Sequence, residues 1–362
     1  IPSGALSVKM TNPVLELPGY FDSAIVDGIP FHRWFTGDDF DNNEIPFHHI
    51  PDYFQGGPPP NPSERVDVAI VGGGLSGLAT AYLLREFHPV VFELRDRFGG
   101  NSQGEQWSGI PYSLGGAYFI SPDEGSFLQQ FYTELGLDRV VRVSTPPDPV
   151  EIYGRIREDF WSGGGLSDEE QVAMQRYAEV VSYYANDAYP DIPLSDDPKE
   201  RARVLSLDQV NFRQDLEERM GMPLTPFLHA GVQGYFYSSF GAAMEEISAA
   251  SGWNFVAAEE YGRWVLPGGN SYLVQALWQR LQQFEQQTSA TCRPSCLRGR
   301  CRVIDVRPRG EDVQVTYYDA EGQLHSIAAR QVVMAGSKHV CKHVLYDLRN
   351  WDREKLDAIN QI

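Results

Sequence analysis

A glycine-rich segment near the first apolar run offers a site for an anionic ligand. Val66–Val71 reads VDVAIV, typical of a buried strand, and the later LATAYLLREF is typical of a helix. Between them lie Gly72, Gly74, Ser76 and Gly77. In this pattern the first glycine permits a tight turn, the second a close approach to a diphosphate, and the third close packing of helix on strand. A diphosphate would then lie at the helix N-terminus, where free N–H groups and the helix dipole attract anions.

An acidic residue stands at the end of the next apolar run, PVVFEL. Glu93 follows Gly72 by 21 residues, a separation at which a carboxylate accepts hydrogen bonds from an adenosine ribose. A GxGxxG pattern alone is weak evidence, because glycine-rich loops are common. Here strand, loop, helix, second strand and terminal acid occur in order, so the sequence predicts a dinucleotide-binding unit.

Two further glycine pairs follow, in ELRDRFGGN and SLGGAYFISP. These segments resemble the flavin monoamine oxidase superfamily, in which an acid, a basic residue and a Gly-Gly pair precede a Gly-Gly-x-Tyr loop. The resemblance extends from about Val66 to Leu137 and resumes from Pro267 to Gly336, and it implies FAD as the cofactor. The positions that it implies along FAD are Glu93 at a ribose, Arg95, Gly99 and Gly100 beside the cofactor, Gly115, Gly116, Ala117 and Tyr118 near the flavin ring, and Val303 at the adenine.

Asn101 also belongs to this predicted cofactor site, but it departs from the superfamily pattern, which usually has arginine after the Gly-Gly pair. A neutral amide does not neutralise phosphate as arginine does, so the cofactor contact at this position is expected to differ. In Asn101 the chain resembles UDP-galactopyranose mutases, flavoproteins that isomerise a sugar without net oxidation. DRFGGN and the stretch from VVMAGSKHV to NWDREKL resemble the spermidine dehydrogenase branch instead.

The resemblance implies an α/β fold, with a glutathione-reductase-like, Rossmann-type FAD-binding domain and a mostly helical substrate lobe. The predicted divisions are an irregular N-terminal extension over 1–65, the FAD-binding domain over 66–150 and 261–340, the helical lobe over 151–260, and the start of a second lobe segment over 341–362. Superfamily members continue well past the equivalent of Gln361. We therefore expect a missing remainder, or a second chain that carries it, and incomplete enclosure of FAD by this chain alone.

Local patterns predict individual elements. Ser167 with Glu170, and Ser206 with Gln209, have the spacing of helix capping boxes. Apolar residues recur at helical spacing at Phe127, Phe131 and Leu135, at Ala173, Tyr177, Val180, Val181 and Tyr184, and at Leu273, Leu277 and Leu281. Residues 301–336 alternate as an antiparallel meander with a turn at 319–322, and QVVMAG ends it as a buried strand.

Charge and composition limit the partners. The formal net charge is −19, and the chain has neither a basic stripe nor interleaved aromatic and basic residues, so nucleic acid is not expected as a partner. An acidic surface favours a cationic substrate such as a polyamine, although acidity also simply keeps proteins dispersed. No apolar run approaches the roughly 20 residues of a transmembrane helix, so no transmembrane segment is predicted.

The chain begins at Ile1 rather than at methionine, which favours removal of a signal peptide or other proteolytic processing. Three of its four cysteines, Cys292, Cys296 and Cys301, lie in CRPSCLRGRC without the two-residue spacing usual for zinc. Disulfides or free thiols are therefore expected there. Disulfides would indicate a periplasmic or extracellular location, because cytosolic thiols are kept reduced.

His339, Cys341 and His343 alternate in KHVCKH. On a strand all three would share a face, whereas on a helix only the two histidines would align. No acidic partner lies nearby in the sequence, so we expect ordinary packing and predict no metal site.

Substrate-binding residues have no comparable motif. Tyr235, Tyr237 and Trp264 belong to an aromatic segment with interspersed glutamates, and we predict that they line a pocket for an amine. The alternative for each is ordinary core packing. No Ser-His-Asp set is evident and none is needed, because a flavin supplies the chemistry itself. The sequence therefore identifies no catalytic side chain.

The resemblance implies an FAD-dependent oxidoreductase of the amine oxidase or dehydrogenase type. Such an enzyme oxidises the C–N bond of an amine, a polyamine or an amino acid by hydride transfer to flavin N5. The alternatives are a flavin-dependent desaturase, an isomerase resembling UDP-galactopyranose mutase, and a flavin-binding subunit without activity of its own.

Overall fold

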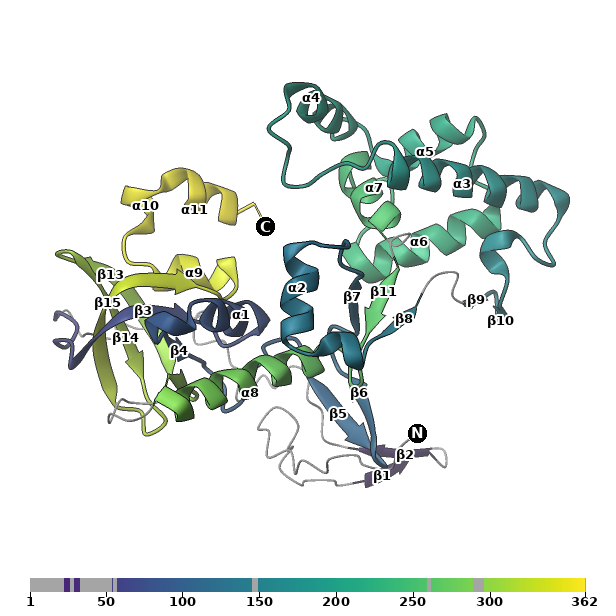
Figure 1. The fold of residues 1–362 in the computed structure, drawn as a ribbon. Helices are drawn as coiled ribbons and strands as arrows, with labels where there is room; N and C mark the ends of the chain where they lie inside the picture. Colours follow the sequence, from purple (N-terminus) through teal and green to yellow (C-terminus); the bar gives the residue numbers. More distant parts are fainter. Residues whose placement is uncertain are drawn as a thin grey trace. The chain divides into compact units, whose positions relative to one another are not determined.

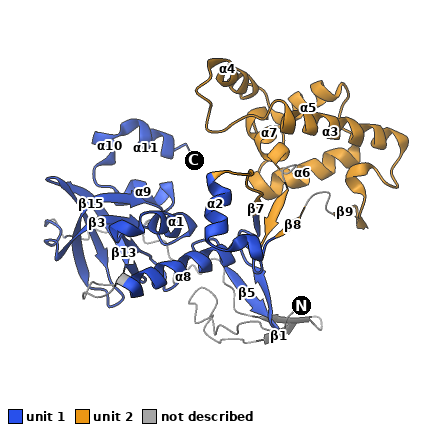
Figure 2. Cartoon of the chain, viewed as in Figure 1, with its two compact units in different colours: residues 1–118, 127–141, 266–362 blue, residues 119–126, 142–265 orange. Residues whose placement is uncertain are grey.

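The computed structural model describes residues 23–26, 29–32, 54, 57–144, 149–258, 262–288 and 296–361 (Figure 1). The chain divides into unit 1, residues 1–118, 127–141 and 266–362, and unit 2, residues 119–126 and 142–265 (Figure 2). The sequence placed the corresponding boundaries near 150 and 260. The longer segment of unit 2 runs from 142 to 265 and contains the antiparallel pair of β8 (Arg142–Ser144) and β11 (Arg263–Val265). Most of the predicted extension lies outside the described residues.

Unit 1 contains a six-stranded sheet in the order β12-β4-β3-β15-β14-β13. Its strands are β3 (Glu64–Val71), β4 (Val90–Phe92), β12 (Leu297–Arg298), β13 (Arg302–Arg309), β14 (Asp312–Tyr318) and β15 (Leu324–Met334). β12, β4, β3 and β15 are parallel, and β13, β14 and β15 form the predicted antiparallel meander. Because the first part of β15 pairs with β14 and its last part with β3, this one strand joins the meander to the parallel sheet. The mixed sheet confirms the α/β prediction.

Helices and two hairpins complete unit 1. The helices are α1 (Leu75–Leu83), α2 (Phe127–Glu134), α8 (Ser271–Thr288), α9 (Lys338–Val344), α10 (Leu348–Trp351) and α11 (Arg353–Ile359), with 3-10 turns at Arg85–Phe87 and Leu137–Arg139. One hairpin is β5 (Gly104–Trp107) with β6 (Ile110–Ser113). The other, β1 (Ser23–Val26) with β2 (Ile29–His32), lies in the extension that was predicted to be irregular. Its strands have four residues each, too few for an alternating pattern to be recognised.

The parallel strands and the meander share one hydrophobic core. The rings of Phe92 of β4 and Tyr317 of β14 pack at a tilt of 46° with centroids 4.7 Å apart, and Val303 and Ile327 are buried in the same cluster. The last strand is less buried than predicted: Val332 and its neighbours in QVVM are half-buried or exposed. The predicted apolar face of α8 is confirmed, since Leu273, Leu277 and Leu281 are all buried.

Unit 2 is mostly helical, as predicted for the substrate lobe. Its helices are α3 (Asp168–Asn186), α4 (Pro198–Leu207), α5 (Phe212–Met220), α6 (Pro226–Phe240) and α7 (Ala249–Ala258), with a 3-10 turn at Phe160–Ser162. A small sheet has the order β7-β11-β8, where β7 is Tyr118–Ile120, and β9 (Val150–Ile152) pairs with β10 (Arg155–Arg157). No helix among the described residues is long and apolar enough to cross a membrane.

One predicted capping box is only half formed. The Ser167 side chain accepts a hydrogen bond from Glu170 N at 3.4 Å and caps α3, as predicted. The Glu170 carboxylate does not return to Ser167. It accepts instead from Thr225 Oγ1 at 2.5 Å and from Phe227 N at 3.1 Å. Glu170 is buried. Its carboxylate accepts a backbone N–H from the first turn of α6, a turn that has no capping bond from its own N-cap residue.

The second predicted capping box is wrong. Ser206 lies inside α4, where its hydroxyl donates to the Arg203 carbonyl oxygen. The next helix, α5, begins after Asn211, whose side chain accepts from Gln214 N at 2.9 Å. Asparagine caps a helix as well as serine does, so the Ser-x-x-Gln spacing was coincidental.

A buried carboxylate organises the core of unit 2. Asp215 is 8% exposed, and its Oδ2 accepts hydrogen bonds from Tyr184 Oη at 3.0 Å, Trp253 Nε1 at 2.7 Å and Arg219 Nε at 2.7 Å. The Tyr184 and Trp253 rings stack with centroids 4.2 Å apart. These contacts join α3, α5 and α7, so the carboxylate determines how the three helices pack.

We predict that Asp215→Asn lowers the free energy of unfolding by about 2–4 kcal/mol, because an amide replaces the charged acceptor of three donors. Chemical denaturation monitored by tryptophan fluorescence measures this loss. Asp208→Asn, at an exposed position at the end of α4, is the matched control and should change stability by less than about 0.5 kcal/mol. Equal stabilities for the two variants would contradict the role of Asp215.

Candidate functional site

The loop between β3 and α1 has glycines that the protein's own backbone requires. Gly72 has φ +112°, and a Cβ there would lie 2.9 Å from the Ala335 carbonyl carbon. A Cβ on Gly77 would lie 1.9 Å from the Gly72 carbonyl oxygen. Any side chain at Gly77 would therefore push α1 away from the end of β3. This is the helix-on-strand packing that the sequence predicted.

Gly74 differs, because nothing in the protein itself crowds it. A Cβ at Gly74 would meet only Gly100, at an ordinary contact distance of 3.7 Å from its Cα. Gly74 is also the N-cap of α1, with no side-chain capping bond and no acidic residue in the first turn. The helix thus begins with uncapped N–H groups beside open backbone. These properties fit the diphosphate that the sequence predicted at this loop.

Glu93 lies directly beside this loop. Its Oε2 accepts from Gly73 N at 2.7 Å and its Oε1 from Arg95 N at 2.9 Å, and it is 7% exposed. Burial raises the pKa of Glu93 above its ordinary value, and the two backbone hydrogen bonds oppose that rise. Each oxygen keeps acceptor capacity for a further donor. The carboxylate is therefore held in place and remains able to bind ribose hydroxyls.

Residues 300–303, in the second part of the predicted FAD-binding domain, lie beside Glu93 and Arg95. Cys301 N donates to Glu93 O at 2.8 Å, and Arg300 N donates to Arg95 O at 2.9 Å. Val303 follows two residues later, buried in β13. The structure thus brings the start of β13, which carries Val303, next to Glu93 and Arg95, which lie far earlier in the sequence.

The second glycine pair touches the first loop through backbone. Gly99 N donates to Gly73 O at 2.8 Å, and a Cβ on Gly100 would lie 3.1 Å from the Cα of Gly74. Both glycines of the pair have positive φ, +123° and +57°. Buried Gln103, which the sequence analysis did not select, donates from Nε2 to Gly100 O at 2.8 Å.

The third glycine pair, Gly115 and Gly116, contacts the backbone of Asn101, the residue that follows the second pair. A Cβ on Gly115 would lie 1.9 Å from the Asn101 carbonyl oxygen, so the Asn101 backbone is part of the site while its side chain is exposed. Gly116 O accepts from Asn270 N at 2.8 Å, and Tyr118 O accepts from Asn270 Nδ2 at 3.1 Å. We call Gly72–Gly77, Gly99–Asn101, Gly115–Tyr118 and Asn270 the glycine seam.

Asn270 is not among the site residues predicted from sequence. The available signal in LPGGN was an asparagine at the N-cap position after two glycines. Gly269 has φ +66°, and a Cβ there would lie 2.8 Å from Gly116 O, so the turn must approach the third pair closely. The glycines of LPGGN therefore serve the seam as well as the turn.

The predicted substrate residues all lie in unit 2, but the structure does not place them in one cluster. Tyr235 packs against Trp161 and Phe255, with ring centroids 5.7 and 6.5 Å apart. Tyr237 is 60% exposed, and because it lies two residues along α6 it projects about 200° away from Tyr235. Trp264 is half-buried on β11, with its ring centroid 6.1 Å from that of Phe119.

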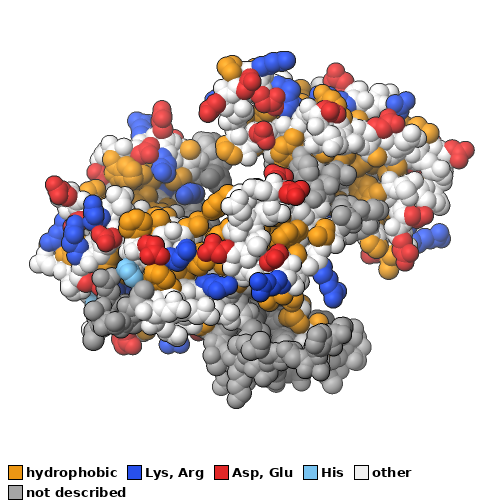
Figure 3. Space-filling model, in the orientation of Figure 1, with side chains coloured by type: hydrophobic (Ala, Val, Ile, Leu, Met, Phe, Trp, Pro, Cys, Tyr) orange, Lys and Arg blue, Asp and Glu red, His pale blue; other side chains and the backbone are white. Residues whose placement is uncertain are grey.

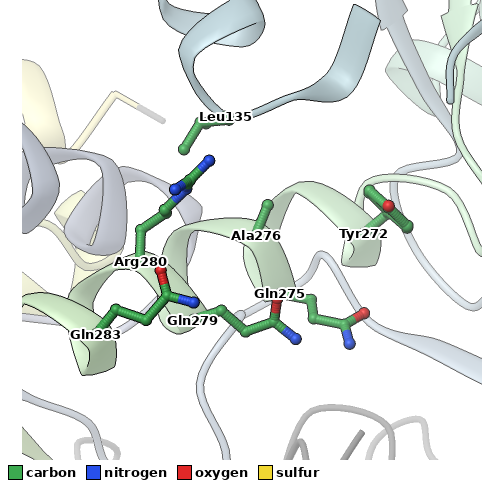
Figure 4. Close-up of a pocket in the computed structure, with 7 residues that line it drawn as sticks. All are labelled: Leu135, Tyr272, Gln275, Ala276, Gln279, Arg280 and Gln283. Carbon is green, nitrogen blue, oxygen red and sulfur yellow. The ribbon is translucent and has the colours of Figure 1, made fainter. Parts of the chain in front are cut away.

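A separate polar cavity of about 290 Å³ lies on unit 1 (Figure 4). Apart from Leu135, its lining residues all come from α8: Tyr272, Gln275, Ala276, Gln279, Arg280 and Gln283. The exposed Arg280 donates to the Glu134 carbonyl oxygen. None of these seven residues belongs to the glycine seam, so the cavity is a different feature.

KHVCKH forms α9, and its two histidine rings lie on one side with centroids 5.6 Å apart. No group of three or more metal-ligating side chains occurs among the described residues. Cys296, Cys301 and Cys341 are free thiols, whereas Cys292 lies outside the described residues. Burial raises the pKa of the Cys296 thiol to about 12, so it is protonated at neutral pH.

We predict that Gly74→Ala and Gly77→Ala separate cofactor binding from folding. Gly74→Ala should change the unfolding free energy by less than about 1 kcal/mol but weaken FAD binding at least about tenfold, because its methyl group occupies the diphosphate position. Gly77→Ala should destabilise the protein by about 3 kcal/mol or more through its clash with Gly72. Denaturation and FAD titration measure the two effects. Unchanged FAD affinity in Gly74→Ala would refute the diphosphate assignment.

We also predict a pH dependence of FAD binding that originates at Glu93. In the free protein the pKa of Glu93 is higher in the folded state than in the unfolded state. The contribution of Glu93 to the unfolding free energy therefore falls as pH rises between these two pKa values. Ribose hydroxyls donate to the ionised carboxylate, so FAD binding releases the proton of Glu93, and FAD affinity should rise with pH until the raised pKa of Glu93 in the free protein is passed. Titrations at several pH values should show this rise in the wild type. Glu93→Gln should bind more weakly and lack the slope; an identical slope in that variant would exclude Glu93.

Comparison with known proteins bears on the family to which the chain belongs. A family model described as flavin containing amine oxidoreductase matches residues 75–362. Amine oxidase (flavin-containing) A of Sus scrofa is 40% identical over 81 residues, which are 22% of this chain and 15% of that protein. Amine oxidase (flavin-containing) B of Homo sapiens is 40% identical over 79 residues, which are 21% of this chain and 15% of that protein. The aligned stretch is thus a small part of either relative.

Solved structures share the fold at low identity. Putrescine oxidase bound to putrescine superposes with a TM-score of 0.55 and 18% identity, covering 77% of this chain and 60% of that chain. A CLA-producing fatty acid isomerase from P. acnes gives 0.53 and 12%, covering 82% and 63%. The described chain therefore spans less than two thirds of either neighbour. Since the family model matches from the first residue of α1 through α11, the chain belongs to the flavin containing amine oxidoreductase family, with FAD as its cofactor.

Proposed function

We propose that this protein oxidises the C–N bond of an amine, a polyamine or an amino acid with FAD. The glycine seam is the observation that carries the proposal. It offers an uncapped helix N-terminus and two further backbone loops, and the positioned carboxylate of Glu93 lies beside it; together they fit an extended dinucleotide. Family membership supplies the amine as the substrate class.

When bound, FAD would accept a hydride from the carbon beside the amine nitrogen, and water would hydrolyse the resulting imine. The residues of this chain would bind and orient. The first turn of α1 would hold the diphosphate and Glu93 the adenosine ribose. Gly99–Asn101 and Gly115–Tyr118 would support the flavin half through backbone, so no side chain of this chain is assigned a proton transfer.

The charge distribution supports a cationic substrate. Unit 2 has 23 acidic and 10 basic residues, and it therefore carries −13 of the chain's formal charge of −19. Figure 3 shows the acidic side chains dispersed among arginines and lysines rather than collected in one patch. Such a field would raise the local concentration of a diamine or polyamine without forming a defined subsite. We therefore propose polyamines as the preferred amines.

Among the predicted pocket residues, Tyr237 is the most exposed, at 60% for the whole residue, so it is the one most available to a cation. We propose Tyr237 as a contact for the amine. Tyr235 and Trp264 each pack against another ring of unit 2, apart from Tyr237, so they would support the lobe rather than share the contact with the amine.

Asn101 favours a second candidate, isomerisation without net oxidation. Its side chain is exposed and uncharged where the superfamily usually has arginine, and the seam uses only its carbonyl oxygen. An enzyme of this kind would need its flavin reduced beforehand, and an amine would leave the oxidised flavin unchanged.

We predict that anaerobic addition of putrescine or spermidine to the FAD-loaded protein bleaches the visible flavin absorbance, because the amine reduces the flavin. Dithionite is the control that shows the flavin to be reducible, and lactose tests a substrate class without amines. Bleaching by dithionite but by no amine or amino acid would sink the oxidase proposal. Turnover of a substrate only after dithionite reduction would favour the isomerase.

A further inference from the structure

Asn270 is the residue immediately before α8. One polar atom of its side-chain amide has a hydrogen-bond partner and the other has none among the described residues. Its Nδ2 donates to the Tyr118 carbonyl oxygen at 3.1 Å. Its Oδ1 is buried and accepts no hydrogen bond from any residue that the structure describes. Turning the amide over would set Oδ1 against the Tyr118 carbonyl oxygen, so the orientation is determined by that neighbour.

The helix gives Asn270 an alternative that it does not use. Val274 N donates to Asn270 O at 3.2 Å, which places Asn270 at the N-cap of α8. An N-cap asparagine commonly accepts with its side-chain oxygen from the first turn of its own helix. Here the amide turns to Tyr118 instead. Leaving a buried acceptor without a donor costs about 1–3 kcal/mol, so a bound donor at this position would recover that energy.

The neighbouring glycines make room for this amide. A Cβ on Gly116 would lie 2.8 Å from Asn270 Nδ2, and a Cβ on Gly269 would lie 3.1 Å from the Cα of Ala117. Only glycine at these positions permits the amide to lie against the loop. The unpartnered oxygen therefore belongs to the end of the glycine seam.

The order of contacts along the seam identifies which part of a dinucleotide would lie there. Glu93 contacts the α1 loop at Gly73, and Asn270 contacts the loop reached through Gly100, Asn101 and Gly115. With the diphosphate at α1 and the adenosine ribose at Glu93, the riboflavin half extends toward Asn270. That half carries hydrogen-bond donors, the ring imide N–H and the ribityl hydroxyls, whereas the diphosphate only accepts.

We propose that Asn270 Oδ1 accepts a hydrogen bond from a donor of the riboflavin half of FAD. Asn270 then has two roles: its Nδ2 holds the Tyr118 loop, and its Oδ1 positions the flavin. The inference rests on the proposed cofactor site but not on the identity of the amine substrate. The ring imide N–H and the ribityl hydroxyls are both hydrogen-bond donors, so either would suit Oδ1.

The test measures FAD affinity in the wild-type protein from which the flavin has been removed, in Asn270→Leu and in a matched control, Asn254→Leu. Asn254 also donates from Nδ2 to a backbone carbonyl, Pro190 O at 2.9 Å, but it lies in unit 2. Each protein is titrated with FAD, with FAD methylated on the ring imide nitrogen, and with an analogue that lacks the ribityl hydroxyls. The reduction potential of the bound flavin is measured in parallel.

The wild type should discriminate about tenfold against one of the two analogues, and Asn270→Leu should abolish that discrimination. If Asn270→Leu loses discrimination against the methylated analogue and its flavin has a changed reduction potential, the ring N–H is the donor. If it loses discrimination against the analogue without ribityl hydroxyls, a ribityl hydroxyl is the donor. Asn254→Leu should be destabilised yet discriminate as the wild type does. Equal discrimination by wild type and Asn270→Leu would overturn the proposal, whereas failure of the wild type to bind FAD would contradict the cofactor site itself.

Discussion

Close contact between backbone segments is the constraint on which unit 1 depends. The tightest example is Gly77 against Gly72, where a Cβ would lie 1.9 Å from a carbonyl oxygen. Gly115 against the Asn101 carbonyl repeats the same distance farther along the seam. A site built from main chain presents N–H groups and little side-chain volume, which suits a long ligand rich in acceptors. Substitutions that add a methyl group at these glycines act on the fold before they act on the chemistry.

The same constraint explains how α8 joins the site. Residues 266–270 approach the third glycine pair so closely that Gly269 and Gly116 admit no side chain. Val274, one turn into α8, lies 3.2 Å from the Cβ position of Gly99. The helix thus supports two of the three glycine loops at once. It follows the helical unit in sequence, so the seam is complete only after the chain has returned to unit 1.

The elements with strong local signals were predictable from sequence. The α1 loop, Glu93, the meander and the apolar face of α8 each follow from residue type and spacing, and the structure contains them. Contacts between distant segments were not predictable. Glu170 caps α6, 55 residues away, rather than its own helix, and Asn270 reaches Tyr118 across 152 residues. Ser206 shows the opposite error. It has the spacing of a capping box with Gln209, but it lies inside α4, whose N-cap is Asp197. The roles of these residues depend on tertiary neighbours, which a single sequence does not specify.

The most direct test of the seam as the FAD site is amide hydrogen exchange with and without FAD. FAD should slow exchange at the uncapped N–H groups of Leu75–Gly77, and also at Gly100–Asn101 and Gly115–Tyr118. The exposed turn at Asp319–Gly322 in the same unit should exchange equally in both states. Protection confined to other segments, with Leu75–Gly77 exchanging freely in the FAD-bound protein, would contradict the assignment of the seam.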